Sequence, residues 1–284
     1  MTTPADERHA LVTAGWVDAR RHDPALVIVD ATVLRSEDGG RRVWLSGRPS
    51  FGDIGHLPGA RFADLLGDLS DPDGATAFTR PAPARLAAAL AALGITRETT
   101  VVAYDTGETR WAARLWWLLR GIGHPDVRVL DGGRDAWVRA GLPLERGTGD
   151  WTPAQRYGAI DEQDVYATRE QVREASDGRR AGVLVHALDH ESYSGGHIAG
   201  AVNVPWQSLL AADGTLDAGP RARRRLLDAA GPEPAVAYCG SGISATLVLL
   251  ALHEAGREPG LLYDGSLADW AWHDEPLVTG GDPR

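Results

Sequence analysis

The chain has 284 residues, 43% of them hydrophobic, so it is long enough for one large domain or two of ordinary size, each with a buried core. Its formal net charge of -10 argues against nucleic acid or an anionic membrane as a partner. The single cysteine excludes an internal disulfide, a CxxC redox pair and a cysteine-rich zinc site. We see no signal peptide and no apolar stretch of roughly 20 residues, and we therefore expect a soluble cytoplasmic protein.

The first half of the chain alternates between predicted strands and helices. Residues 26–30, Leu-Val-Ile-Val-Asp, form a short apolar run that is typical of a buried parallel strand. A helix with an alanine and leucine face is predicted over residues 83–93, and Gly94 ends it. A strand over 99–104, a helix over 112–121 and a strand over 127–130 follow. This alternation predicts an α/β domain with a mostly parallel sheet.

The second half of the chain repeats the first. Three segments return in the same order: Gly-His-x-x-Gly-Ala at 55–60 and 196–201, an apolar strand with Tyr near its end at 101–105 and 235–239, and Asp-Gly-x4-Trp at 131–137 and 264–270. The spacing from Asp105 to Trp137 agrees within one position with the spacing from Cys239 to Trp270. Three ordered matches indicate a diverged duplication.

The duplication predicts two homologous α/β domains, over residues 1–145 and 156–284. The segment around 144–155 carries Gly147, Gly149 and Pro153, as a linker does. In the second domain, residues 183–185 correspond to the first strand. Ligands of such sheets bind beyond the carboxyl ends of the strands. Asp105 and Cys239 both fall at that edge, directly after a strand.

Cys239 begins a loop of small residues, Cys-Gly-Ser-Gly-Ile-Ser-Ala, which precedes a predicted helix over 246–252. Two glycines allow the backbone to curl so that successive N–H groups point at one atom, and the helix dipole adds positive potential there. We therefore expect Cys239 to be largely thiolate and to act as a nucleophile or hold a persulfide anion. The predicted cradle consists of Gly240, Ser241, Gly242, Ile243, Ser244 and Ala245.

Other interpretations of this loop are less well supported. A lone cysteine is usually a buried core thiol, but the position between a strand and Gly-Ser-Gly favours chemistry. A phosphate-binding loop of the Walker type needs a lysine after the second glycine, and none is present. Cysteine phosphatases need an arginine six positions after the nucleophile, where this chain has Ala245.

These motifs together resemble the tandem rhodanese family over nearly the whole chain. The loop is similar to that of the 3-mercaptopyruvate sulfurtransferase branch, because Gly240 and Ser241 stand where the thiosulfate branch has basic residues. The resemblance implies that only the second domain is catalytic, and that Asp105 marks the inactive loop of the first domain. It also implies that the thiolate takes a sulfur from a donor and passes it to cyanide, a thiol or thioredoxin. No metal or organic cofactor is implied.

The second domain departs from the family at the donor pocket. The family has two arginines there that bind the substrate carboxylate, whereas this chain has Leu188 and Ser192. A carboxylate buried without a bidentate partner is costly. Either the donor is neutral or larger, or other side chains bind it. The candidates are Arg48, His56 and Arg110 of the first domain and His186 and His190 of the second.

Several of these side chains also have a structural interpretation. His56 and His197 each belong to a Gly-His turn; for His197 a structural role is favoured, and for His56 both roles stay open. A metal site of His186, His190 and His197 is disfavoured because no carboxylate completes the set. Structural or solvated roles are also predicted for Asp30, Asp131, Asp264 and the arginine-rich segment 221–225.

Two functional hypotheses follow. The first is an enzyme that transfers a sulfane sulfur through a Cys239 persulfide. The second, which the replaced arginines favour, is a persulfide carrier that serves a partner enzyme and has little activity on small donors. A non-catalytic scaffold is disfavoured because the loop keeps its small residues and its thiol. The physiological donor, the acceptor and the oligomeric state stay open.

Overall fold

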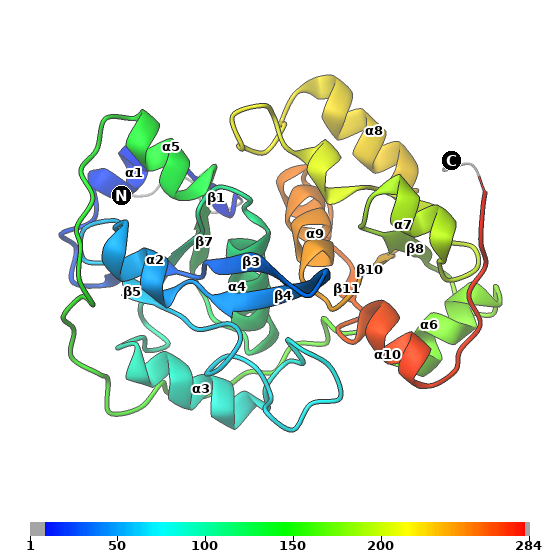
Figure 1. The fold of residues 1–284 in the computed structure, drawn as a ribbon, viewed down its shortest axis with the longest axis horizontal. Coiled ribbons are helices and arrows are strands. Elements are labelled where there is room, and N and C mark those ends of the chain that lie inside the picture. The colour runs from blue at the N-terminus through cyan, green and yellow to red at the C-terminus, as the bar shows by residue number, and fades with distance from the viewer. Residues whose placement is uncertain (1–8, 282–284) are drawn as a thin grey trace. The chain divides into compact units, whose positions relative to one another are not determined.

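The computed structural model describes residues 9–281. Its internal contacts divide the chain into two units. We call Leu11–Gln163 with Asp213–Thr215 the N-terminal unit, and residues 164–212 and 216–281 with residues 9 and 10 the C-terminal unit. Both are mixed α/β units with parallel sheets flanked by helices (Figure 1). No helix within residues 9–281 is both long and apolar enough to cross a membrane.

The sheet of the N-terminal unit has five parallel strands in the order β1-β7-β6-β2-β5. Its predicted strands are present as β2 (Leu26–Asp30), β6 (Thr100–Tyr104) and β7 (Val127–Leu130), and two short strands, β1 (Leu11–Val12) and β5 (Arg61–Phe62), form the edges. The predicted helices are α3 (Pro83–Ala92) and α4 (Arg110–Gly121), and three further helices are α1 (Ala14–Asp18), α2 (Arg48–Asp53) and α5 (Gly133–Arg139). Apolar side chains of the central strands form the core.

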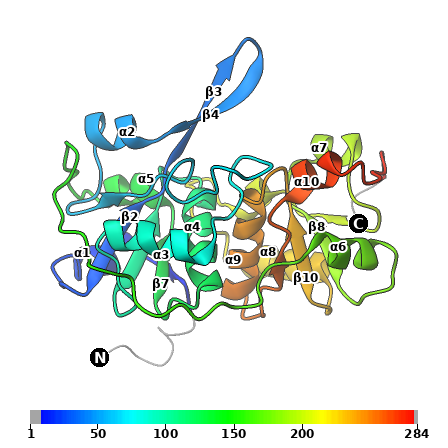
Figure 2. The same cartoon turned by 90° about the horizontal axis from the view of Figure 1, so that it is seen from below.

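An antiparallel hairpin that the sequence did not lead us to expect follows β2. It consists of β3 (Val33–Asp38) and β4 (Arg41–Ser46), and it projects from the rest of its unit in Figure 2. Gly39 and Gly40 form its turn, both with positive φ (55° and 80°), which favours the turn types that match strand twist. Trp44 anchors the hairpin by an edge-to-face contact with Trp111, with ring centroids 5.2 Å apart.

The sheet of the C-terminal unit has four parallel strands in the order β11-β10-β8-β9. They are β8 (Val183–His186), β9 (Val202–Asn203), β10 (Ala235–Tyr238) and β11 (Leu261–Leu262). The helices are α6 (Arg169–Ser176), α7 (His190–Gly195), α8 (Pro220–Ala230), α9 (Ser244–Glu254) and α10 (Ser266–Trp272), with a 3-10 turn η2 at Trp206–Leu209. Helix α9 is almost entirely buried, which explains its nearly continuous apolar sequence.

The repeated motifs make the same contacts in both units. The hydroxyl of Tyr104 accepts a hydrogen bond from the N–H of Leu57 at 3.2 Å, and Tyr238 does the same for Ile198 at 3.0 Å. The indoles of Trp137 and Trp270 donate to the carbonyls of Pro143 and Pro276 at 2.8 and 2.9 Å, respectively. The conserved spacing within this chain therefore reflects shared packing, which agrees with a duplication.

Residues 146–163 lie along the N-terminal unit rather than forming a free linker. The Trp151 indole donates to the carbonyl of Ala92 at 3.0 Å, and the N–H of Arg97 donates to the carbonyl of Tyr157 at 2.8 Å. The Tyr157 hydroxyl bonds to Nδ1 of the buried His124 at 2.7 Å. By its internal contacts, the N-terminal unit therefore extends to Gln163, and the main part of the C-terminal unit begins at Asp164. The bounds 1–145 and 156–284 stay predictions from the sequence.

Candidate active site

Cys239 follows β10 directly, at the carboxyl end of the parallel sheet. Its side chain is 2% exposed. Strand β8 lies beside β10, with His186 paired to Tyr238, and the next residue, Ala187, donates its N–H to the carbonyl of Tyr238 at 2.9 Å. The chain leaves the sheet at this edge, which is where open α/β sheets place their ligands.

The loop from Cys239 leads into the first turn of α9. Gly242 has φ of +75°, a conformation that glycine adopts without steric cost and that turns the loop toward the helix. Ile243 is the N-cap, and its carbonyl accepts hydrogen bonds from the N–H and hydroxyl of Thr246 at 3.0 and 2.6 Å. The N–H groups of Ser244 and Ala245 lie in the first helical turn, where no intrahelical acceptor exists. They are available to a negatively charged atom.

Helix α10 orients the peptide groups of this loop. The N–H groups of Leu267 and Ala268 donate to the carbonyls of Cys239 and Gly240, both at 3.0 Å. In a trans peptide the N–H points opposite to the carbonyl of the preceding residue. The N–H groups of Gly240 and Ser241 therefore point away from α10.

Ser266, the first residue of α10, contacts the loop with its side chain. Its Oγ accepts the N–H groups of Cys239 and Gly242, both at 3.0 Å, and donates to the carbonyl of Tyr263 at 2.9 Å. The sequence analysis did not single out Ser266. The signal was present, because the duplication aligns this serine with Gly133 of the first repeat.

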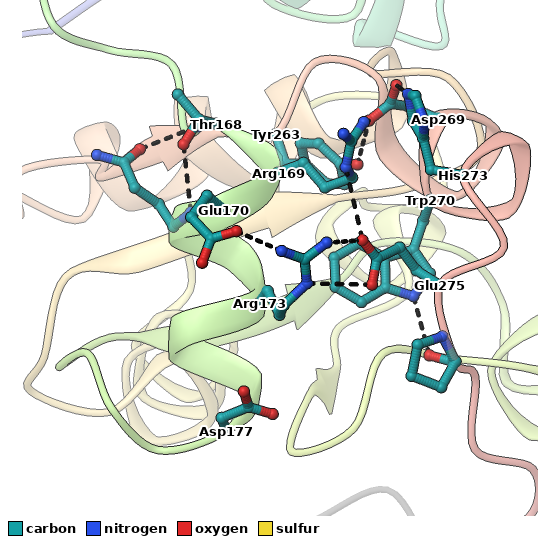
Figure 3. Close-up of polar contacts among 12 residues, drawn as sticks. Thr168, Arg169, Glu170, Arg173, Asp177, Tyr263, Asp269, Trp270, His273 and Glu275 are labelled. Carbon is teal, nitrogen blue, oxygen red and sulfur yellow. Dashed lines mark hydrogen bonds and ion pairs between the residues drawn. The ribbon is translucent and has the colours of Figure 1, made fainter.

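A polar network holds α10 against α6 (Figure 3). The Tyr263 hydroxyl donates to Oδ2 of Asp269 at 2.5 Å, and Arg169 lies 3.6 Å from both Asp269 and Glu275. Arg173 also pairs with Glu275, and this hydrogen bond holds the pKa of the Glu275 carboxyl below its usual value. Burial, with the bond to Asp269, raises the pKa of Tyr263. The turn that carries Ser266 is thus fixed on both sides.

The N-terminal unit contains the same loop with an anion inside it. The buried carboxylate of Asp105 accepts four backbone N–H groups, from Gly107 and Thr109 at 2.9 Å, Trp111 at 3.0 Å and Ala112 at 3.2 Å. Burial raises the pKa of Asp105, and these hydrogen bonds oppose the shift. The loop geometry of this fold therefore collects N–H groups around one negatively charged group.

The duplication maps this arrangement onto the second loop. Helices α4 and α9 begin at the same distance after Asp105 and Cys239, so the aligned positions correspond one to one. The N–H groups that contact the Asp105 carboxylate correspond to those of Ser241, Ile243, Ala245 and Thr246. Of these four, the Thr246 N–H bonds to Ile243 instead. Three N–H groups of the predicted cradle are left for a sulfur anion.

The two candidate donor-binding residues of the C-terminal unit, His186 and His190, have different environments. His186 is fully buried; its ring lies edge-on to Tyr193 and Tyr238, with centroids 5.5 and 5.2 Å away, and Asn203 bonds its carbonyl. Burial lowers the pKa of His186 to about 4. His190 is exposed at the start of α7, with Nε2 3.4 Å from Oγ of Ser194. The geometry favours a core role for His186 and leaves His190 a candidate.

Leu188 lies beside the catalytic loop. A Cβ atom built on Gly240 would be 4.0 Å from Cδ1 of Leu188, while Ser192 sits in α7 with its N–H bonded to Asp189 at 2.8 Å. The position at which the family is expected to have a guanidinium therefore holds an apolar side chain near the loop. Among residues 9–281, no group of three or more His, Cys, Asp or Glu side chains is placed to hold a metal ion.

The three candidates of the N-terminal unit have different environments. Arg48 is exposed, with its guanidinium 4.9 Å from the ring centroid of Phe62. Arg110 pairs with Glu108 at 2.7 Å. His56 is 1% exposed and stacks on Phe51 with ring centroids 3.8 Å apart, as His197 stacks on Tyr193 at 3.7 Å. This shared stacking supports a structural role for both histidines, and donor binding by Arg48, His56 and Arg110 stays a prediction.

Comparison with known proteins gives consistent results. The Rhodanese-like domain family matches residues 13–140 and 168–273. A Pseudomonas aeruginosa protein named "Probable 3-mercaptopyruvate sulfurtransferase" is 35% identical, over 96% of this chain and 98% of that one. The crystal structure of the 3-mercaptopyruvate sulfurtransferase SseA from Escherichia coli aligns with a TM-score of 0.80 at 29% identity, over 91% and 98% of the two chains.

The fold is shared more widely than the sequence. An anaerobic ergothioneine biosynthesis enzyme from Chlorobium limicola, solved with trimethyl histidine, aligns with a TM-score of 0.81. The two proteins are 22% identical, and the alignment covers 96% of this chain and 71% of that one. This likeness concerns the fold alone.

Proposed function

The chain belongs to the rhodanese family and is a sulfurtransferase, and from this premise we propose that Cys239 is the nucleophile that carries the sulfur. The main support is the match between two loops. The first loop surrounds the Asp105 carboxylate with backbone N–H groups, and the second presents the corresponding N–H groups after Cys239. A thiolate or persulfide at this position gains the same kind of stabilisation.

The proposed reaction has two steps. The Cys239 thiolate attacks the outer sulfur of the donor, a new S–S bond forms, and the donor leaves with the electron pair of the broken bond. The acceptor, a thiolate or cyanide, then attacks the outer sulfur of the persulfide, and the Cys239 thiolate leaves. N–H groups of Ser241, Ile243 and Ala245 stabilise the negative charge in both states. Nucleophilic catalysis of this kind needs no metal or organic cofactor.

The donor and acceptor are proposed by chemical class. A small sulfane-sulfur donor, similar to 3-mercaptopyruvate or thiosulfate, loads Cys239, and a thiol, cyanide or a thioredoxin-like protein removes the sulfur. Donor binding by Arg48, His56, Arg110 and His190 stays a prediction, whereas burial of His186 argues against such a role. A cytoplasmic location stays a prediction.

The second candidate function is a persulfide carrier for a partner enzyme. The leucine at position 188 favours it, because this apolar side chain near the loop cannot bind a small carboxylate donor as a guanidinium would. The carrier and the enzyme share Cys239 and its cradle. The two functions differ in whether small donors transfer sulfur to Cys239.

Intact-mass measurement tests the proposal. The protein is incubated in turn with thiosulfate, 3-mercaptopyruvate and glutathione persulfide. We expect a gain of one sulfur atom that cyanide removes and that the variant Cys239→Ser does not show. Loading by glutathione persulfide alone would support the carrier. If none of the three donors adds sulfur to Cys239, the proposed function is wrong.

A further inference from the structure

Ser266 has a backbone conformation that a side chain makes costly. Its φ is +52°, in the left-handed region, where residues other than glycine are uncommon. The aligned residue of the first repeat is Gly133, with φ of +57°. A strained serine in place of a glycine requires a compensating interaction. The serine is also completely buried, so its hydroxyl needs partners within the protein.

The hydroxyl of Ser266 uses its full hydrogen-bonding capacity on the loop. A serine hydroxyl has one donor and two acceptor positions. Both acceptor positions take loop N–H groups, from Cys239 and Gly242, and the donor goes to the carbonyl of Tyr263. The two N–H groups belong to the residues on either side of Gly240 and Ser241. The hydroxyl therefore fixes both ends of the turn that follows the nucleophile.

In the N-terminal unit a different group orients the N–H groups of the corresponding loop. Gly133 has no hydroxyl, and a Cβ built there would lie 2.2 Å from the carbonyl oxygen of Asp105. In that loop the Asp105 carboxylate itself organises the N–H groups of Gly107, Thr109 and Trp111. In the second loop the aligned residue is Cys239, whose sulfur changes between thiolate and persulfide during the proposed reaction. It therefore cannot be a fixed acceptor for the loop N–H groups. The C-terminal unit needs an organiser that stays in place when the sulfur changes.

We propose that Ser266 is the positioning residue of the catalytic loop: its hydroxyl holds the N–H groups of Cys239 and Gly242 away from the sulfur, so that those of Ser241, Ile243 and Ala245 face it. This inference rests on the proposed function of Cys239. Together with the N–H groups of Leu267 and Ala268, which hold the loop carbonyls, Ser266 fixes the cradle before a donor arrives. Preorganised N–H groups stabilise a developing anion without reorganisation during the reaction.

Three substitutions separate the hydroxyl from the backbone strain. Ser266→Gly removes both the hydroxyl and the strain, Ser266→Ala removes only the hydroxyl, and Ser266→Thr keeps the hydroxyl with more strain. The control is Ser176→Ala, which removes a serine hydroxyl that bonds the carbonyl of Ala199 at 3.1 Å, far from the loop in sequence. Each protein is loaded with glutathione persulfide, and sulfur transfer to cyanide is followed as thiocyanate.

We expect kcat to fall about tenfold to a hundredfold in Ser266→Gly and Ser266→Ala, because loop N–H groups lose their alignment to the sulfur. The KM for the donor should change less than kcat, and the persulfide should decay faster. Ser266→Thr should retain more kcat than Ser266→Gly if it folds, as near-UV circular dichroism reports. Ser176→Ala should match the wild type.

Two failures are distinguishable. If the wild type is never loaded, the proposed function of Cys239 fails. If the wild type is loaded and Ser266→Gly transfers sulfur with unchanged kcat and persulfide lifetime, the function stands and the positioning role of Ser266 is wrong. Glycine adopts this φ without strain, so Ser266→Gly should fold. Its kcat and persulfide lifetime can therefore be compared directly with those of the wild type.

Discussion

The imidazole of His186 lies edge-on to the phenol ring of Tyr238, with ring centroids 5.2 Å apart, on the core side of the catalytic strand β10. Side chains alternate across a strand, so Cys239, the next residue after Tyr238, starts on the opposite side. The Nε2 atom of His186 is buried and has no hydrogen-bond partner among residues 9–281. The histidine is therefore held neutral in the core beneath the site.

This burial predicts a pH dependence of stability. Burial lowers the pKa of His186 to about 4 in the folded protein, below the 6.5 of an unperturbed histidine. Between these values the unfolded chain binds a proton that the folded chain does not, so stability falls as pH decreases from 6.5 toward 4. From pH 7 to pH 5 this residue should cost about 2 kcal/mol of unfolding free energy.

The measurement is urea denaturation of the wild type and of His186→Phe at pH 7 and pH 5. The wild type should lose about 2 kcal/mol more between the two pH values than the variant does. The control is His22→Asn, which removes an exposed histidine and should follow the wild type. An equal loss in His186→Phe would show that this histidine is not the titrating group.

A second prediction concerns the anion in the N-terminal loop. In Asp105→Asn, one side-chain oxygen becomes an NH2 group, which would face the N–H groups of Trp111 and Ala112 or those of Gly107 and Thr109. Buried donors without an acceptor should cost about 2 kcal/mol of stability. Denaturation curves at pH 7 check this value. An unchanged midpoint would mean that the carboxylate does not organise the loop.

The sequence was sufficient for the parts of the fold that rest on long apolar runs and on repetition. Strands β2 and β6 are apolar except for one terminal residue each, helix α4 is apolar apart from its arginines and final glycine, and the aligned Asp105 and Cys239 located both loops. The β3–β4 hairpin was not predicted because its strands mix polar and apolar residues and lack the continuous apolar run of a buried strand. The Gly39-Gly40 pair was the available signal.

The site was predictable only where one segment carries it. The cradle is local to 239–245, so its residues follow from the loop sequence. Ser266 reaches the loop through tertiary contacts across 24 and 27 positions, which no local pattern reveals. The side chain of His186 points into the core because of strand alternation, which the sequence analysis did not apply at that position. Contacts that depend on side-chain direction therefore needed the structure.

A third prediction uses the glycine that corresponds to Ser266. Gly133 has φ of +57°, and an added Cβ would meet the carbonyl oxygen of Asp105 at 2.2 Å, a backbone atom that cannot move without the loop. Gly133→Ala should therefore cost about 2–4 kcal/mol, from the backbone conformation and the overlap together. The matched control is Gly141→Ala, where φ is +74° but no heavy atom lies within 4 Å, so only the conformational cost applies. Calorimetry of both variants measures the difference, and similar melting temperatures would contradict the steric argument.

The fourth prediction concerns the donor. Leu188 lies near Gly240 of the catalytic loop, at a position where the family is expected to have an arginine, and Ser192 stands at the second such position. A guanidinium binds a carboxylate with two parallel hydrogen bonds, which a leucine cannot replace. The double variant Leu188→Arg with Ser192→Arg should therefore raise kcat/KM for 3-mercaptopyruvate about tenfold or more, since a bidentate charged contact contributes roughly 1.5–3 kcal/mol.

The comparison needs a neutral control and a donor without a carboxylate. Leu188→Met keeps an apolar side chain of similar volume and should leave turnover of 3-mercaptopyruvate unchanged. Loading by sodium disulfide, a persulfide source that has no carboxylate, should respond far less to the arginines than 3-mercaptopyruvate does. Equal gains with both donors would indicate a general electrostatic effect on the Cys239 thiolate. No gain with 3-mercaptopyruvate would mean that loss of the two arginines does not limit this protein, and the donor would then be sought among larger persulfide-bearing molecules.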